Sequence, residues 1–286
     1  MQIYFAVFLA NLLKKCYYIL IKPKTDYVKV YYMQQIHISE SNLVIENRVY
    51  SASFYAKEEM PDGTKRGTFR SYSVLVDGDN ICFKNCVFEN NAGKGKDVGQ
   101  GIALYLDGDE IKLENCVLKG HQDTLFLAPL PDKELVPGGF TGPKQFTERK
   151  RHTVYFKNCV IEGGVDFIFG GATAYFDNCE FVSVEEGYVF APSTPADVEV
   201  GFVATNCRFT ARDIVAPGSC YVARPWRNHA YVRLENCYLG EHIHPLGFDD
   251  WNKTEAHKTM RFYENGSYGP GANSERPDYV KCVKFR

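Results

Sequence analysis

The dipeptide Asn-Cys recurs six times in strand-like runs, and this repeat constrains the fold more than any other feature of the chain. The copies read FKNCVF, LENCVL, FKNCVI, FDNCEF, ATNCRF and LENCYL, with cysteines at positions 86, 116, 159, 179, 207 and 237. Successive cysteines are separated by 30, 43, 20, 28 and 30 residues. Most copies alternate apolar and polar residues with the period of two that is expected of a strand with one buried face.

Repeats of this length that supply strands and turns but no helix are typical of a parallel β-helix, in which equivalent residues of successive coils stack. Cys then acts as a small apolar side chain in an internal stack, and the Asn side chains pair along a ladder. Disulfides and metal ligation are the alternatives, although no CxxC or Cys/His pair has the spacing of a zinc site. The unequal gaps predict loops of different length, which commonly carry the binding site.

Composition agrees with an all-β domain. The chain has 286 residues, of which 45% are hydrophobic, enough for a sizeable core, and its 19 Tyr and 20 Phe favour strands. The formal net charge of −2 and a pI near 6.4 argue against a protein that binds the phosphate backbone of nucleic acids. We therefore expect no nucleic-acid partner.

The N-terminus reads MQIYFAVFLANLLKKCYY, a short apolar run followed by Lys14 and Lys15. A secretory signal carries its positive charge before the apolar run, and this run is too short for a clean membrane span. We expect residues 1–29 to be an atypical segment, whether a signal, a cap or an aberrant start, and residues 30–286 to form the β-helix domain. We expect no membrane span, and the compartment stays open.

Two aspartates break the repeat in the same way. Cys116 to Asp123 and Cys159 to Asp166 are both seven residues. In a stacked solenoid, equal offsets place both carboxylates on one face of neighbouring coils, about 5 Å apart at the backbone. Carboxylates that close have their pKa values driven apart, so that one becomes a candidate acid and the other a candidate base or nucleophile. A turn cap or ladder residue is the alternative for either aspartate taken alone.

The segment YVARPWR offers a cation and an aromatic surface. Arg224 precedes a proline, which favours an extended backbone. A guanidinium fork on Asp166 would keep that carboxylate ionised and oriented. Trp226 offers a flat face on which a sugar ring can stack.

Three blocks of this sequence together resemble the pectin methylesterases, the pectinesterases of carbohydrate esterase family 8. They are GQGIALYLDGDEIKLENCVLKGHQDTLF, GGVDFIFGGATAYFDNCEF and ARPWRNHAYV, and they occur in the order of the family. The resemblance covers roughly residues 30 to 275, from YYMQQIHISESNLVIEN to RFYENGSYGPGA.

The resemblance implies a right-handed parallel β-helix that hydrolyses the C6 methyl esters of galacturonate in homogalacturonan, without a metal or an organic cofactor. It implies a monomer whose partner is methylated pectin, and the family is usually exported. The matching positions are Asp166 as nucleophile, Asp123 as acid and base, Gln122 and Gln100 as oxyanion donors, Arg224 as partner of the nucleophile, and Thr68, Trp226 and Phe169 as substrate contacts.

The chain also departs from the family pattern. His121 stands where the family often has Tyr, and we interpret it as a wall of the cleft rather than a proton carrier. Residues 127–152 read as an inserted loop, because four prolines and three glycines exclude regular structure. The basic residues of this loop, Lys144, Arg149, Lys150 and Arg151, either meet a polyanionic substrate or belong to a solvated loop.

Other readings of the chain stay open. His242 and His244 have the i, i+2 spacing of a strand but no third metal ligand close in sequence. A pectate lyase-like β-helix would need a calcium-binding carboxylate cluster and a catalytic Arg or Lys. A non-catalytic carbohydrate-binding solenoid is the third hypothesis.

Overall fold

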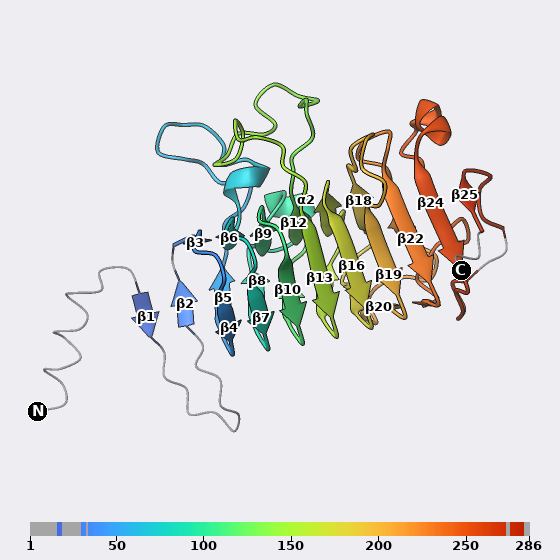
Figure 1. Cartoon of the computed structure of the whole chain (residues 1–286), viewed down its shortest axis with the longest axis horizontal. Coiled ribbons are helices and arrows are strands. Elements are labelled where there is room, and N and C mark those ends of the chain that lie inside the picture. The colour runs from blue at the N-terminus through green and yellow to red at the C-terminus, as the bar shows by residue number, and fades with distance from the viewer. Residues whose placement is uncertain (1–15, 19–29, 33, 273–274, 283–286) are drawn as a thin grey trace, which may run out of the picture.

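The computed structural model describes residues 16–18, 30–32, 34–272 and 275–282. The chain winds into coils that each contribute short strands, and equivalent strands of successive coils pair into three long sheets (Figure 1). Pairs between successive coils, such as β10–β13, β11–β14 and β12–β15, are parallel. The predicted parallel β-helix is therefore confirmed. Within the described residues, no helix is long and apolar enough to cross a membrane.

The three sheets are named here A, B and C. Sheet A contains, in order, β1 (Cys16–Tyr18), β2 (Val30–Tyr32), β5 (Val49–Ala52), β8 (Val87–Asn90), β11 (Val117–Lys119), β14 (Val160–Gly163), β17 (Glu180–Ser183), β20 (Arg208–Ala211) and β23 (Tyr238–Leu239). Sheet B contains β3 (Ile36–Ile38), β6 (Val74–Val76), β9 (Leu104–Leu106), β12 (Leu125–Leu127), β15 (Ile168–Gly170), β18 (Gly187–Pro192) and β21 (Cys220–Ala223). Sheet C contains β4 (Val44–Glu46), β7 (Cys82–Lys84), β10 (Ile111–Glu114), β13 (Thr153–Lys157), β16 (Thr173–Asp177), β19 (Phe202–Thr205), β22 (Tyr231–Glu235), β24 (Arg261–Asn265) and β25 (Val280–Lys281).

Helical elements are short and lie in the connections. They are η1 (Thr68–Arg70), α2 (Gly95–Val98) and η2 (Thr254–Lys258). Most of the predicted atypical segment, residues 1–29, falls outside the described residues. Of that segment the structure describes β1, which pairs antiparallel with β2.

The Asn-Cys repeat marks the corner between sheets C and A. Asn115, Asn158 and Asn178 adopt φ angles of 53°, 54° and 51°, a left-handed conformation that Asn tolerates better than most residues. Their side chains form the predicted ladder, in which Asn158 Nδ2 donates to Asn115 Oδ1 at 3.3 Å and Asn178 Nδ2 donates to Asn158 Oδ1 at 2.8 Å. The corner geometry therefore explains why Asn occurs in every repeat.

The six cysteines of the repeat form the predicted internal stack. All are at most 1% exposed, and none is in a disulfide. The Cys159 thiol donates to the backbone oxygen of Leu113 at 3.4 Å. A hydrogen bond with the Cys159 thiol, together with burial, raises the pKa of Cys116 to about 12. Cys116 is therefore a structural group with little thiolate character.

The hydrophobic core has two parts. The first fills the solenoid and stacks aromatic rings along the coils, as with Phe156 and Phe176, whose centroids lie 4.6 Å apart. The second covers the outer face of sheet B, where Phe126 packs beneath Phe69 of η1 at 5.0 Å. Phe140 of the long loop joins this outer cluster, 5.7 Å from Phe69. Two loops distant in sequence thus close over the same sheet face.

The long loop connects β12 to β13 and contains no helix or strand, as the sequence predicts. Neither alternative for Lys144, contact with a polyanion or solvation, is correct. The side chain is 16% exposed, and its ammonium lies 2.6 Å from Asp77 Oδ2 and 3.2 Å from Asp107 Oδ2. These carboxylates come from turns of the two preceding coils. Lys144 therefore ties the loop to the solenoid through a partly buried ion-pair cluster.

Candidate active site

Asp123 and Asp166 occupy equivalent positions in neighbouring coils. Each lies two residues before its strand of sheet B, and the strands pair with Leu125 opposite Ile168. The backbone N–H of Asp123 donates to the oxygen of Val165 at 3.0 Å, which fixes the two corners together. The equal offset in the sequence is therefore explained by equal placement in the structure.

Arg224 holds Asp166 through a two-pronged contact. Its Nε donates to Asp166 Oδ1 at 2.7 Å, and its NH2 group donates to Oδ2 at 2.6 Å. The guanidinium carbon also lies 3.9 Å from the ring centroid of Tyr188 and 3.7 Å from that of Trp251. Two hydrogen bonds and two aromatic faces restrict the orientation of the Arg224 guanidinium. The orientation of the Asp166 carboxylate is therefore also fixed.

The surroundings assign different protonation states to the two aspartates, which are 7% and 8% exposed. Burial raises the pKa of Asp123 well above its usual value, and the negative charge of Asp166 raises it further. Burial also raises the pKa of Asp166, but the hydrogen bonds and the positive charge of Arg224 act in the opposite direction. Asp123 is therefore the better proton carrier, and Asp166 is the better anion.

Gln100 and Gln122 lie on neighbouring coils beside this pair. The N–H of Gly101 donates to the backbone oxygen of Gln122 at 3.0 Å, which brings the two glutamines together at the same corner. A Cβ atom on Gly95, the first residue of α2, would lie 2.4 Å from Gln122 Oε1, so glycine permits this close approach. Among the described residues, neither glutamine amide has a hydrogen-bond partner. Both are free to donate to a bound group.

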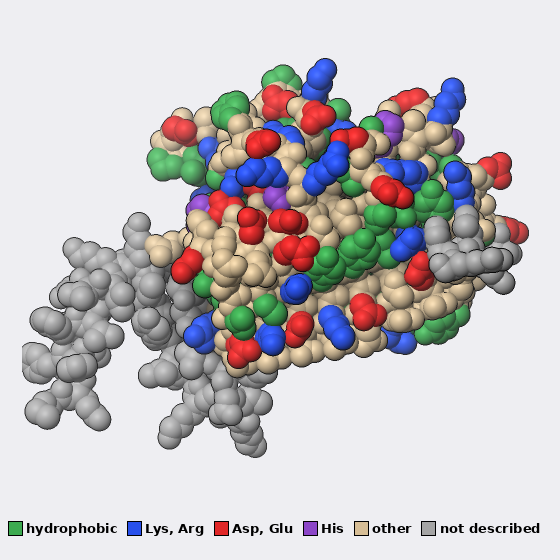
Figure 2. All heavy atoms as spheres, viewed as in Figure 1, with side chains coloured by type: hydrophobic (Ala, Val, Ile, Leu, Met, Phe, Trp, Pro, Cys, Tyr) green, Lys and Arg blue, Asp and Glu red, His purple; other side chains and the backbone are tan. Residues whose placement is uncertain are grey.

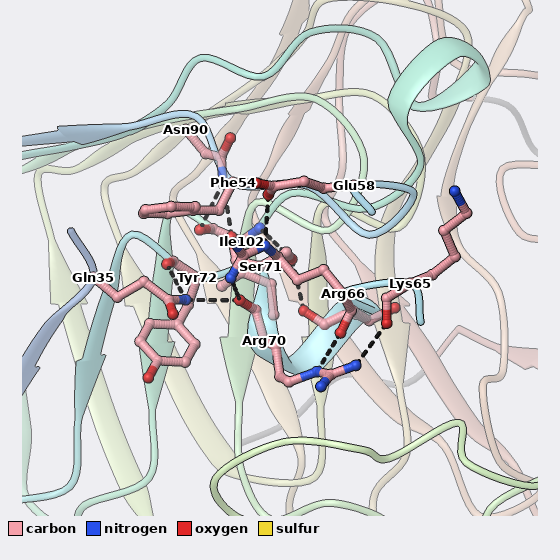
Figure 3. A network of polar contacts seen from close by, with 11 residues as sticks. Gln35, Phe54, Glu58, Lys65, Arg66, Arg70, Ser71, Tyr72, Asn90 and Ile102 are labelled. Atoms are coloured by element: carbon pink, nitrogen blue, oxygen red, sulfur yellow. Dashed lines mark hydrogen bonds and ion pairs between the residues drawn. The ribbon is translucent and has the colours of Figure 1, made fainter. Parts of the chain in front are cut away.

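Thr68 begins η1, which a network of polar contacts anchors to the first coils (Figure 3). Asn90 Nδ2 donates to the backbone oxygens of Phe54 and Ile102 at 2.9 and 3.1 Å. Gln35 Nε2 donates to the oxygen of Arg70 at 2.7 Å, at the end of η1. The network fixes the half-buried Thr68 next to the outer aromatic cluster.

Trp226 lies over that cluster with part of its ring accessible. Phe169 is 4% exposed, and its ring centroid lies 5.6 Å from that of Trp226. Phe169 therefore packs against Trp226 and presents little of its own surface, and its contact with substrate stays a prediction.

Of the histidines singled out in the sequence, His121 and His244 have local partners, whereas the buried Nε2 of His242 has no hydrogen-bond partner among the described residues. His121 Nδ1 lies 3.2 Å from Glu185 Oε1, with 29% of its side chain exposed. His244 stacks on Tyr221 with centroids 4.5 Å apart, and burial lowers the pKa of His242 to about 4. The described residues contain no group of three or more His, Cys, Asp or Glu side chains placed to hold a metal ion.

Sequence reasoning missed Tyr188, Trp251 and Lys253. Lys253 Nζ donates to the backbone oxygens of Pro225 and Trp226 at 2.7 and 3.2 Å, and it lies 4.2 Å from the ring centroid of Trp251. Burial, assisted by nearby arginines, lowers the pKa of Lys253 to about 8. The only available signal was the DDW turn, in which Asp249 Oδ1 accepts from the N–H of Trp251 at 2.6 Å. Nothing local indicates that this turn folds back onto Arg224.

Comparison with known proteins points to one family. The family model described as Pectinesterase matches residues 21–129 and 145–284, and the unmatched residues 130–144 lie inside the predicted insertion. Pectinesterase 31 of Arabidopsis thaliana is 32% identical over 212 residues. This alignment covers 73% of the chain but 59% of that relative, so the chain spans less than two thirds of its length.

Solved structures give the same result. The pectin methylesterase of Aspergillus niger, crystallised in a penultimately deglycosylated form, has a TM-score of 0.72 at 26% identity, covering 90% of this chain and 80% of that one. A pectin methylesterase in complex with hexasaccharide VII has a TM-score of 0.67 at 26% identity, covering 86% and 80%.

Proposed function

Because the chain belongs to the pectinesterase family, we propose that it hydrolyses the C6 methyl esters of galacturonate in pectin, giving pectate and methanol. The observation that carries this proposal is the pair of buried aspartates, of which one is gripped by Arg224 and the other is free to hold a proton. The substrate is inferred from the family and from the hexasaccharide complex of a related esterase.

In the first step, an ionised oxygen of Asp166 attacks the carbonyl carbon of the ester. The carbonyl oxygen becomes negatively charged, and the amide N–H groups of Gln100 and Gln122 stabilise it. Protonated Asp123 gives its proton to the departing methoxy oxygen as the ester C–O bond breaks. Methanol leaves, and an anhydride joins Asp166 to the galacturonate carbonyl.

In the second step, Asp123 is a carboxylate and takes a proton from a water molecule. The resulting hydroxide attacks the anhydride at the galacturonate carbon, which breaks its bond to Asp166. The product leaves as a carboxylic acid, which then loses its proton to solvent. Asp166 regains its negative charge beside Arg224, and Asp123 is again protonated. One ester and one water thus yield one acid and one methanol.

Methanol release from highly methylated pectin tests the proposal. We expect Asp166→Ala to abolish release, because the nucleophile is absent. Asp123→Asn should bind pectin normally but slow turnover by about 10²- to 10⁴-fold, the usual value of acid–base catalysis. Normal turnover in either variant would refute the assignment.

A calcium chelator in the same assay separates the alternatives. Methanol release that is unaffected by the chelator supports the esterase. An unsaturated, ultraviolet-absorbing product formed only with calcium would indicate a lyase-like protein. Pectin binding without either product would indicate a non-catalytic solenoid.

A further inference from the structure

A large pocket of the described residues lies away from the two aspartates. It has a volume of about 1160 Å³ and forms where β13 and β16 begin, between the long loop and the segment after β18. We call it the corner groove. Asp123, Asp166 and Arg224 are not among its lining residues. Figure 2 views this side, where Lys, Arg, Asp and Glu side chains mix along the loops above sheet C.

Two polar atoms in the lining of the corner groove are buried without a partner. Ser193 is 4% exposed and His152 is 6% exposed. The Oγ of Ser193 and the Nδ1 of His152 have no hydrogen-bond partner among the described residues, whereas His152 Nε2 lies 3.3 Å from Asp107 Oδ1. An unpaired buried polar atom is unfavourable, because it has lost its hydrogen bonds to water. Hydroxyl groups of a bound molecule would satisfy both atoms.

The corner groove also contains two arginines that no carboxylate neutralises. Arg149 donates to the backbone oxygens of Lys144 and Gln145, and Arg227 donates to those of Trp226 and Lys133. Within the described part of the chain, neither arginine has a carboxylate partner. Backbone oxygens hold the guanidinium groups in place but leave their positive charge available to an anion.

These features together indicate which class of ligand the corner groove would bind. Unpartnered Oγ and Nδ1 atoms suit hydroxyl groups, and the two arginines suit scattered carboxylates. Asp132, Asp197 and Glu199 also line the groove, and they would repel a densely charged polyphosphate. A chain that carries many hydroxyl groups and one carboxylate per sugar fits this mixture.

The position of the groove relates it to the catalytic site. Arg227 lines the groove, while its neighbour Trp226 belongs to the aromatic cluster beside the aspartates. Phe140 of the long loop packs against Trp226, with the two ring centroids 6.3 Å apart. A long polymer held at the catalytic site therefore has the corner groove within reach of its next segment.

We propose that the corner groove is a second, non-catalytic binding site for de-esterified galacturonan, and this inference rests on the proposed function. Free carboxylates would contact Arg149 and Arg227, and sugar hydroxyls would contact Ser193 and His152. Binding of product segments there would tether the enzyme to a polymer and raise the local concentration of the remaining esters.

The test compares a long and a short substrate. We expect Arg149→Gln and Ser193→Ala to raise the KM for partly de-esterified pectin about 3- to 10-fold through loss of tethering, with kcat unchanged. The KM for a methylated trisaccharide, which occupies the catalytic site alone, should not change. Lys150→Gln is the matched control, because it removes the neighbouring positive charge from an exposed side chain that does not line the groove.

Equal KM values for variant and wild-type enzyme on both substrates would overturn the proposal, and so would an equal rise on both. Ser193→Ala guards against misfolding, since it removes a buried hydroxyl that has no partner and should not lower Tm. Retardation of the inactive Asp166→Ala protein in a pectate gel, reduced by adding Ser193→Ala or Arg149→Gln, tests the groove even if no methanol is released. Undiminished retardation in those double variants would exclude it.

Discussion

Replacement of Arg224 is the sharpest test of how the site works. Arg224→Met removes both hydrogen bonds to Asp166, at 2.7 and 2.6 Å, together with the positive charge between Tyr188 and Trp251. Hydrogen bonds to a charged group contribute about 1.5–3 kcal/mol each, so the ionised form of Asp166 would lose about 3–6 kcal/mol. The pKa of Asp166 should therefore rise, because burial still disfavours the charged carboxylate and Arg224 no longer opposes it.

The sign of the effect on activity follows from the nucleophile. In the proposed mechanism Asp166 attacks as an anion, so activity should fall on the acid side as this carboxyl takes up a proton. Without Arg224 the carboxyl is protonated at higher pH, and the acid limb of the kcat/KM profile should therefore move upward. Arg224→Lys keeps a charge but cannot make two parallel bonds or fill the slot between two rings, and we expect an intermediate shift.

Methanol release between pH 4 and 9 measures these profiles. Arg212→Met is a suitable control, because Arg212 also contacts a carboxylate, Glu162 at 2.8 Å, but with 55% of its side chain exposed. Exposed pairs contribute at most about 1 kcal/mol, and this variant should keep the wild-type profile. An unshifted acid limb in Arg224→Met, in a protein that remains folded, would show that Arg224 does not keep Asp166 ionised.

Two further predictions concern stability. Asp123 has a pKa raised in the folded state, so the stability that it contributes is complete below the unfolded pKa near 4 and is lost as the pH rises toward the folded pKa. The Tm advantage of Asp123→Asn over wild type should therefore grow from pH 4 to pH 8 in thermal melts, and a constant difference would contradict this. Asn158→Ala should lower the free energy of unfolding by about 1–2 kcal/mol in urea titrations, through left-handed strain and loss of the Asn ladder. Asn158→Gly removes the ladder contacts without that strain, so equal losses in the two variants would show that the φ of 54° imposes no strain on alanine.

The parts of the structure that follow from repetition were predictable from the sequence. Each Asn-Cys copy predicts its own backbone conformation and also which copies pack beside it, because a solenoid stacks equivalent residues. Asp123 and Asp166 follow the cysteines of two successive repeats by the same seven residues, and this equal offset predicts that they lie on adjacent coils. Both the fold and the aspartate pair follow from a short local sequence pattern that recurs in successive coils.

The parts built by loops were not predictable in the same way. Trp251 reaches Arg224 through a turn outside the repeat, and Lys144 crosses from a long loop to the turns of two preceding coils. Such contacts depend on the path of irregular loops, and the spacing of the Asn-Cys repeat does not predict that path. The prediction that Lys144 lies at a surface failed because charge alone does not reveal a partly buried ion pair.

The backbone at Asp123 and Asp166 joins the structural and catalytic interpretations of these residues. Their φ angles are 64° and 50°, in the same left-handed region as the Asn residues of the ladder, but at the corner between sheets A and B. Asn and Asp are the side chains other than glycine that adopt this conformation most readily. A solenoid corner that needs a left-handed residue thus already favours Asp. In the proposed mechanism, burial and an arginine from a later coil convert the corner residue Asp166 into the nucleophile. Since Asn satisfies the same corner without a charge, Asp123→Asn separates chemistry from folding: its turnover should fall while its coil stays intact.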